Sequence, residues 1–177
     1  MPERIVVGVD GGGTKTEAVA IDEAGRVVGR GIAGPGNWEL IGMGGLLAAA
    51  SHALDLALDE AKVHRADVAA SAFALAGVDW PSDEARLRPG LAQLGLGGEL
   101  VLVNDAFAAM RAGCDEPFGA VSNAGTGTVT AARNRAGERP ARSRCSATAS
   151  AAARATSSTW RCTRSHAPTT ARPRRRC

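Results

Sequence analysis

An apolar run that stops at a carboxylate and three glycines constrains the fold of this chain more than any other feature. The run Ile5–Val9 is rich in residues that favour β-strands, and a second strand-forming run lies at residues 18–21. Between the two runs stand, in order, Asp10, Gly11, Gly12, Gly13, Thr14, Lys15 and Thr16. This order predicts a β-hairpin with a glycine-rich tip, preceded by a carboxylate and followed by two hydroxyls around a lysine.

The predicted tip has the chemistry of a phosphate-binding loop. Glycines let backbone N–H groups approach an anion without Cβ atoms in the way. Thr14 and Lys15 offer further donors to phosphate oxygens, and Asp10 offers a carboxylate to Mg²⁺. A P-loop would need its lysine directly after a glycine, and a dinucleotide-binding turn would open a helix instead of a second strand. The alternative that remains is an ordinary glycine-rich turn that closes the hairpin.

Charge and composition divide the chain in two. Residues 1–132 carry nine basic and seventeen acidic side chains, whereas residues 133–177 carry twelve basic side chains and one acid, Glu138. Aromatic residues make up 3% of the chain, so its core must be built from Ala, Val and Leu. No apolar run reaches the ~20 residues of a membrane-spanning helix and no signal pattern opens the chain, so we expect no membrane partner and a cytoplasmic location.

The hydrophobic pattern predicts alternating strands and helices. We expect strands at residues 4–9, 15–21, 26–33, 68–75 and 100–103, helices at 39–63, 84–94 and 106–112, and two further strands at 118–121 and 129–132. A three-strand meander followed by alternating helices and strands indicates an α/β layer with a mixed sheet.

Polar groups gather where predicted strands end, which is where α/β sheets bind ligands. Asn37 and Trp38 follow the third strand, and they can hold a sugar through an amide and an indole face, or the indole can simply pack on the core. Asn104 and Asp105 follow the strand at 100–103. Asp105 can accept a proton from a substrate hydroxyl, or it can merely cap the next helix. A second glycine–hydroxyl turn lies at residues 125–127.

Together these motifs resemble those of the BadF/BadG/BcrA/BcrD ATPase family, in its N-acetylglucosamine-kinase-like branch, among the actin-like ATPases and sugar kinases. The resemblance is carried by residues 8–16, 36–38, 104–106 and 124–128, and it covers residues 4 to about 138. It implies an actin-like (ribonuclease H-like) ATPase lobe with a mixed sheet at residues 1–115. It further implies the first hairpin of a second lobe at residues 116–138. Composition alone marks residues 139–177 as a low-complexity basic tail.

The resemblance also implies a site and a reaction. Asp10 would place Mg²⁺ and Asp105 would act as the base, while Asn37, Trp38 and Asn104 would contact the sugar. Phosphate would be held by Gly11, Gly12, Gly13, Thr14 and Lys15, and from the second turn by Gly125, Thr126 and Gly127. The implied reaction is ATP-dependent phosphorylation of a hydroxyl of an amino sugar such as N-acetylglucosamine or glucosamine, with a homodimer expected for the full-length form.

Two other functions stay open at this point. One is an ATPase that activates a dehydratase or reductase through an iron–sulphur cluster shared between subunits. The other is a non-catalytic sugar- or nucleotide-binding protein.

The tail has a restricted alphabet. Residues 139–177 use eight residue types, without Leu, Ile, Val, Gly or an acid, and every type except His is encoded with C or G at the middle codon position. A slipped reading frame in a GC-rich gene gives this alphabet. We therefore expect the tail to be frameshifted and disordered, the strands at 118–132 to lack partners, and kinase activity to be impaired. The alternative is a basic extension that binds nucleic acid by charge, and we favour the frameshift.

Overall fold

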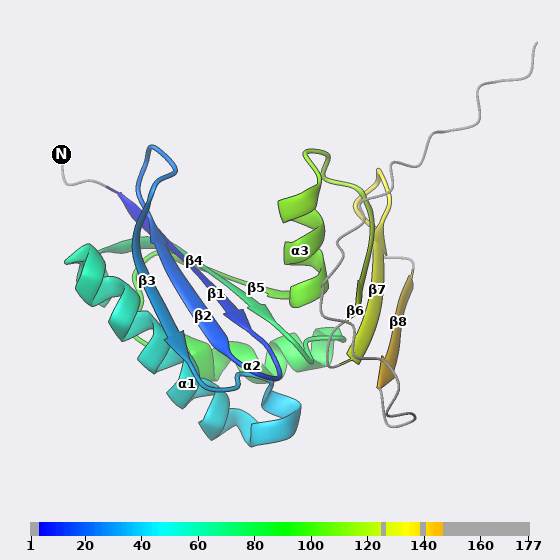
Figure 1. Cartoon of the computed structure of the whole chain (residues 1–177), viewed down its shortest axis with the longest axis horizontal. Coiled ribbons are helices and arrows are strands. Elements are labelled where there is room, and N and C mark those ends of the chain that lie inside the picture. Colours follow the sequence, from blue (N-terminus) through cyan, green and yellow to red (C-terminus); the bar gives the residue numbers. More distant parts are fainter. Residues whose placement is uncertain (1–3, 125–126, 139–140, 147–177) are drawn as a thin grey trace, which may run out of the picture. The chain divides into compact units, whose positions relative to one another are not determined.

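The computed structural model describes residues 4–124, 127–138 and 141–146 and divides the chain into two compact units, Met1–Ala109 and Met110–Cys177 (Figure 1). The division falls inside helix α3, Asp105–Gly113, six residues before the lobe boundary that we expected at 115/116. Each unit has its own β-sheet.

The first unit is built on a five-stranded mixed sheet in the order β3-β2-β1-β4-β5. The strands are β1 (Ile5–Gly11), β2 (Thr16–Ile21), β3 (Val27–Ala33), β4 (Val68–Leu75) and β5 (Glu99–Asn104). Strands β1, β2 and β3 form an antiparallel meander, whereas β4 runs parallel to β1 and β5 runs parallel to β4. The α/β class, the meander and the mixed sheet expected from the sequence are confirmed.

Helices α1 (Trp38–Ala61) and α2 (Pro81–Ala92) complete the core of this unit, and the short 3-10 helix η1 (Arg65–Asp67) precedes β4. Helix α1 packs on β1, β2 and β3, and α2 packs on α1 and β5 (Figure 1). The core is mostly aliphatic, as the scarcity of aromatics requires, but it also contains a fully buried aromatic, Phe73, which the expected Ala, Val and Leu core did not include. Its other large, fully buried side chains include Leu46, Leu54, Leu75, Leu87 and Leu91.

Two glycines of β3 let α1 lie directly against the sheet. A Cβ atom on Gly29 would overlap the carbonyl oxygen of Ala57, and one on Gly31 would overlap the carbonyl oxygen of Ala53. The facing helix positions, Ala53 and Ala57, are themselves small and fully buried. The backbone of the helix therefore rests on the backbone of the strand, which leaves no room for a larger residue on either side.

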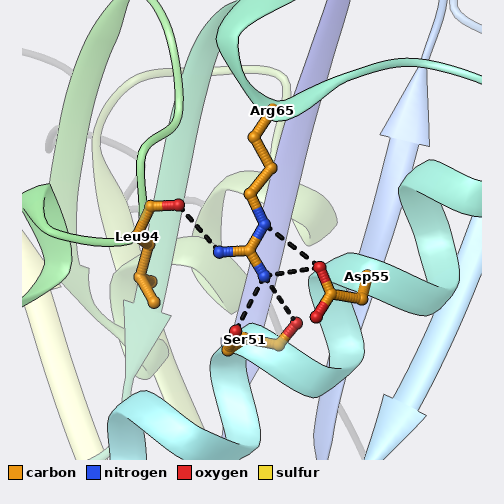
Figure 2. A network of polar contacts seen from close by, with 4 residues as sticks. All are labelled: Ser51, Asp55, Arg65 and Leu94. Carbon is orange, nitrogen blue, oxygen red and sulfur yellow. Dashed lines mark hydrogen bonds and ion pairs between the residues drawn. The ribbon is translucent and has the colours of Figure 1, made fainter.

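Arg65 ties α1 to the segment after α2 (Figure 2). Its guanidinium donates to Asp55 Oδ1 at 2.6 and 3.1 Å, to Ser51 Oγ at 2.7 Å and to the Leu94 carbonyl oxygen at 2.7 Å. Because Arg65 lies just before β4, this network is at the amino end of that strand. It stabilises the end of the sheet opposite to the one where the polar loops gather.

Helix α1 has the length and hydropathy that a membrane-spanning helix needs, contrary to our expectation that no apolar stretch reaches that length. Six of its residues are buried in the core of the first unit, and its backbone is interrupted at Gly42, which has φ 72° and ψ 173°. It serves as the main core helix of this unit.

The second unit contains an antiparallel sheet of β6 (Gly119–Ala124), β7 (Gly127–Arg133) and β8 (Ala141–Ser146), in that order. The two expected strands are present, but β8 contradicts two expectations: that the tail is disordered, which is wrong for residues 141–146, and that the pair lacks a partner. The chain reverses at a turn in which Asn134 and Glu138 exchange hydrogen bonds and Gly137 has φ 84°. Main-chain pairing needs no apolar side chains, so composition alone did not reveal this strand.

Candidate functional site

The carboxyl ends of three strands meet at one edge of the first sheet. In the register of β1, β4 and β5, Gly11 pairs with Leu75, and Leu75 pairs with Asn104. Asp10 is one position before this line, and Asp105 is one position after it. The two carboxylates that the sequence singled out are thus brought to the same edge, where a ligand of an α/β sheet binds.

The glycine-rich tip is the loop between β1 and β2, as expected. The ladder of these strands ends at the pair Gly11–Thr16, and the Gly12 N–H donates to the Lys15 carbonyl oxygen at 2.9 Å. Thr14 and Lys15 are exposed at the tip, and Lys15 Nζ forms an ion pair with Glu17 Oε2 at 2.6 Å. The loop leaves the hydroxyl and ammonium donors accessible to a phosphate.

The three glycines of the tip have different reasons to be glycine. A Cβ on Gly11 would come within 2.6 Å of Leu75 Cδ2, so packing excludes a side chain there. On Gly12 the nearest atom would be the Lys15 carbonyl oxygen at 3.5 Å, and on Gly13 it would be Leu40 Cδ1 at 4.0 Å. Neither residue has a positive φ. Neither the fold nor the backbone requires glycine at these two positions, and the space beside them is open to a ligand.

The environment of Asp10 suits a cation. The Asp10 side chain is exposed, but the protein atoms around its carboxyl still desolvate it enough to raise its pKa. The negative charges of Asp105 and then Glu17 raise that pKa too, while the charge of Lys15 opposes them. A bound cation would relieve this repulsion. Among the described residues no cluster of three or more His, Cys, Asp or Glu could hold a metal by itself. The Asp10 carboxylate by itself still fits Mg²⁺, because this ion is commonly held by one or two carboxylates together with phosphates and water.

Asn104 links two acidic residues of the edge. It is buried, its Nδ2 donates to Asp79 Oδ1 at 3.0 Å, and its Oδ1 accepts from the Ala106 N–H at 3.0 Å. The same N–H also lies 2.8 Å from Asp105 Oδ1, and Asp105 is the first residue of helix α3. Asn104 accepts the N–H two residues further on and so has the contact of the helix cap, which the sequence had offered to Asp105. Asp105 lies beside it at the sheet edge.

Asp79 belongs to this edge although the sequence reading gave it no role. It lies in the turn that follows β4, and its Oδ1 accepts a hydrogen bond from the side-chain amide of Asn104. The sequence signal was weaker than for Asp105, because a turn at residues 76–78 separates Asp79 from the end of β4, whereas Asp105 directly follows β5.

Asn37 and Trp38 begin α1. The Asn37 side chain is buried, and its Oδ1 accepts the Glu39 N–H at 3.0 Å as the cap of the helix. The Trp38 indole N–H donates to the Gly77 carbonyl oxygen at 3.0 Å, and the Arg86 guanidinium lies 5.1 Å from the ring centroid. Trp38 is also packed against the core, so it has the packing role that we held as the alternative.

The second predicted phosphate turn cannot be placed against this edge. Gly125 and Thr126 lie outside the described residues, and Gly127 is the first residue of β7 in the second unit. Their role in phosphate binding stays a prediction.

Comparison with known proteins finds relatives of similar sequence and fold. The chain is 29% identical over 147 residues to N-acetyl-D-glucosamine kinase of Dictyostelium discoideum, an alignment that covers 77% of this chain and 46% of the relative. The solved structure of a putative N-acetylglucosamine kinase from Porphyromonas gingivalis matches 78% of this chain and 47% of its own, with a TM-score of 0.63 and 22% identity. A ROK family glucokinase from Streptomyces griseus, solved with glucose and AMPPNP, matches 72% of this chain and 44% of its own, with a TM-score of 0.51 and 27% identity.

These similarities concern part of each relative, since the chain spans about half the length of the proteins that it matches. The first unit has the fold of an actin-like ATPase lobe. The model of the BadF/BadG/BcrA/BcrD ATPase family matches residues 7–164, which is most of the chain and extends past the boundary at 138 that we expected. The chain belongs to the BadF/BadG/BcrA/BcrD ATPase family.

Proposed function

We propose that this chain carries the sugar-binding and first phosphate-binding elements of an ATP-dependent kinase that phosphorylates a hydroxyl of an amino sugar such as N-acetylglucosamine or glucosamine. The observation that supports the proposal most is the open space at Gly12 and Gly13, beside two carboxylates that repel each other. A polyphosphate with Mg²⁺ fills such a space and neutralises such a repulsion. The relatives named as N-acetylglucosamine kinases suggest the class of acceptor.

In the proposed reaction Asp105 accepts the proton of the sugar hydroxyl while the hydroxyl oxygen attacks the γ-phosphorus of ATP. The bond from the γ-phosphorus to the β,γ-bridging oxygen breaks, and ADP leaves with the electron pair. The N–H groups of the hairpin, Thr14 and Lys15 stabilise the charge that develops on the phosphates. Asp10 would hold Mg²⁺, which would supply positive charge to neutralise the phosphates.

The sugar side of the site is assigned in the same proposal. Asn37, Trp38 and Asn104 lie at the starts of α1 and α3, and we assign them to the sugar. Gly125, Thr126 and Gly127 would add phosphate donors from the second unit. We propose a homodimer for the full-length form only. We also propose a cytoplasmic location, where ATP and sugar substrates occur.

Two binding measurements and one activity measurement test the proposal. Calorimetry should detect binding of a non-hydrolysable ATP analogue, and this binding should require Mg²⁺. In a separate titration it should detect binding of N-acetylglucosamine. A coupled assay of ADP release over a panel of amino sugars should give low turnover, since we expect the frameshifted tail to impair the activity. Asp105→Asn should lower that turnover by at least about 10²-fold, because the general base is lost. Sugar binding without turnover would fit either an impaired kinase or a non-catalytic binding protein. Absence of both ligands would contradict the proposal.

A further inference from the structure

Three loops at the edge of the first sheet are joined by main-chain hydrogen bonds through the glycine-rich tip. The Gly12 carbonyl oxygen accepts both the Gly36 N–H at 2.8 Å and the Asn37 N–H at 3.0 Å. The Gly11 carbonyl oxygen accepts the Ala76 N–H at 2.9 Å. The proposed phosphate loop and the residues that precede α1 are thus in direct contact.

Gly36 and Thr16 make this contact tight. A Cβ on Gly36 would overlap Thr16 Oγ1 and would lie 3.0 Å from Gly11 Cα. Thr16 is fully buried, and its Oγ1 is the buried side-chain oxygen or nitrogen that lacks a hydrogen-bond partner within the described part of the chain. An unpaired buried hydroxyl is costly. In this position the hydroxyl fills the space directly against the Cα of Gly36.

The two partners of this contact differ in rigidity. Thr16 and Gly11 close the ladder between β1 and β2, which holds six residue pairs in register. The segment from Gly34 to Asn37 has no ladder of its own and is held by the two hydrogen bonds to Gly12. If a larger residue replaces Gly36, we therefore expect the segment from Gly34 to Asn37 to move and the β1–β2 hairpin to keep its position.

We propose that Gly36 and Thr16 are positioning residues that fix Asn37 against the phosphate hairpin and thereby set the geometry of the sugar site. This inference rests on the proposed function, because it takes the ligand near Asn37 to be the sugar. Asn37 is held at three places in this arrangement: its N–H by Gly12, its Oδ1 by the Glu39 N–H, and its predecessor by Thr16 and Gly11. A displacement of residue 36 therefore moves the amide that we assign to the sugar.

A cycle of substitutions tests the inference in the full chain. Gly36→Ala should weaken the binding of N-acetylglucosamine by about tenfold or more, because a misplaced polar group loses its directional bonds. The affinity for the magnesium-bound, non-hydrolysable ATP analogue should change by less than about threefold, because the hairpin is held in the β1–β2 ladder. Adding Thr16→Ala removes the overlapping hydroxyl, so the double variant should recover most of the lost sugar affinity. The matched control is Gly34→Ala, since a Cβ on Gly34 meets nothing within 4 Å.

Amide hydrogen exchange gives a second readout that needs no ligand. The amides of residues 36 and 37 should exchange at least about tenfold faster in Gly36→Ala, return toward the original rate in the double variant, and leave the Ala76 amide unchanged. If the protein binds neither ligand, the proposed function fails, and this exchange pattern alone decides whether the contact exists. Unchanged exchange at Asn37 in Gly36→Ala would overturn the inference. So would equal loss of sugar and nucleotide binding, or a double variant no better than the single one.

Discussion

Two sets of glycines in the first unit look alike in the sequence and differ in the structure. Gly29 and Gly31 of β3 face the backbone of α1, where a Cβ atom would overlap a carbonyl oxygen. Gly12 and Gly13 of the hairpin face open space, where a Cβ atom would meet nothing closer than 3.5 Å. The first set is explained by the fold. Packing gives no reason for the second set, and the proposed phosphate loop gives one, because glycine lets a phosphate approach the backbone.

The largest effect is expected where a glycine belongs to the fold. Gly31→Val should lower the free energy of unfolding by about 4 kcal/mol or more, because the side chain must displace α1 from the sheet. Urea unfolding followed by circular dichroism measures this change. Gly34→Ala, an exposed glycine with an empty Cβ position, should stay within about 0.5 kcal/mol of the wild type. Equal stability of both variants would contradict the close contact of helix and strand.

A smaller effect is expected for the carboxylates beside the open glycines. Asp105→Asn removes a negative charge and should lower the pKa of Asp10, which is raised first by desolvation and then by that charge. Titration of the Asp10 carboxyl carbon by NMR measures the shift.

The raised pKa of Asp10 also affects stability. Ionised Asp10 lowers the free energy of unfolding at neutral pH, and this loss is relieved as the pH falls through the folded-state pKa.

The matched control for this titration is Asp79→Asn. Asp79 is not among the groups that shift the pKa of Asp10, so that variant should leave it in place. In Asp105→Asn, Mg²⁺ binding at Asp10 should persist to a lower pH than in the wild type. An Asp10 titration identical in wild type and Asp105→Asn would show that the two carboxylates do not interact.

The smallest effect concerns a position where the backbone favours glycine and the sequence has lysine. Lys62 follows α1 with φ 57° and ψ 42°, the left-handed conformation that glycine adopts without a steric cost. Lys62→Gly should therefore raise the stability slightly, by about 0.5–1 kcal/mol. Thermal unfolding measures this change. A loss of stability would mean that the Lys62 side chain makes a contact that outweighs its backbone strain.

Much of the first unit could be predicted because its patterns are local. The apolar runs of β1, β4 and β5 and the Ala/Leu periodicity of α1 each follow from a short window of sequence. The hairpin and the strand-end position of Asp105 follow from the same patterns.

Other features depend on contacts between distant residues. The Trp38 ring meets Gly77 and Arg86, which lie 39 and 48 positions further along the chain, and no local pattern indicates this. The close contact of α1 with Gly29 and Gly31 is likewise visible only in three dimensions. Strand β8 was missed for a different reason, because backbone hydrogen bonds formed it where the side chains gave no signal. The reading frame after Glu138 stays a hypothesis, and sequencing the source DNA tests it.

The central claim, that Gly12 and Gly13 are glycines for a ligand and not for the fold, is tested most directly by Gly13→Ala. The account predicts that this variant unfolds within about 0.5 kcal/mol of the wild type but binds the magnesium-bound, non-hydrolysable ATP analogue at least about tenfold more weakly. The comparison variant Gly34→Ala should keep both stability and nucleotide affinity. Unchanged nucleotide affinity in Gly13→Ala, or a loss of stability as large as that of Gly31→Val, would contradict the claim.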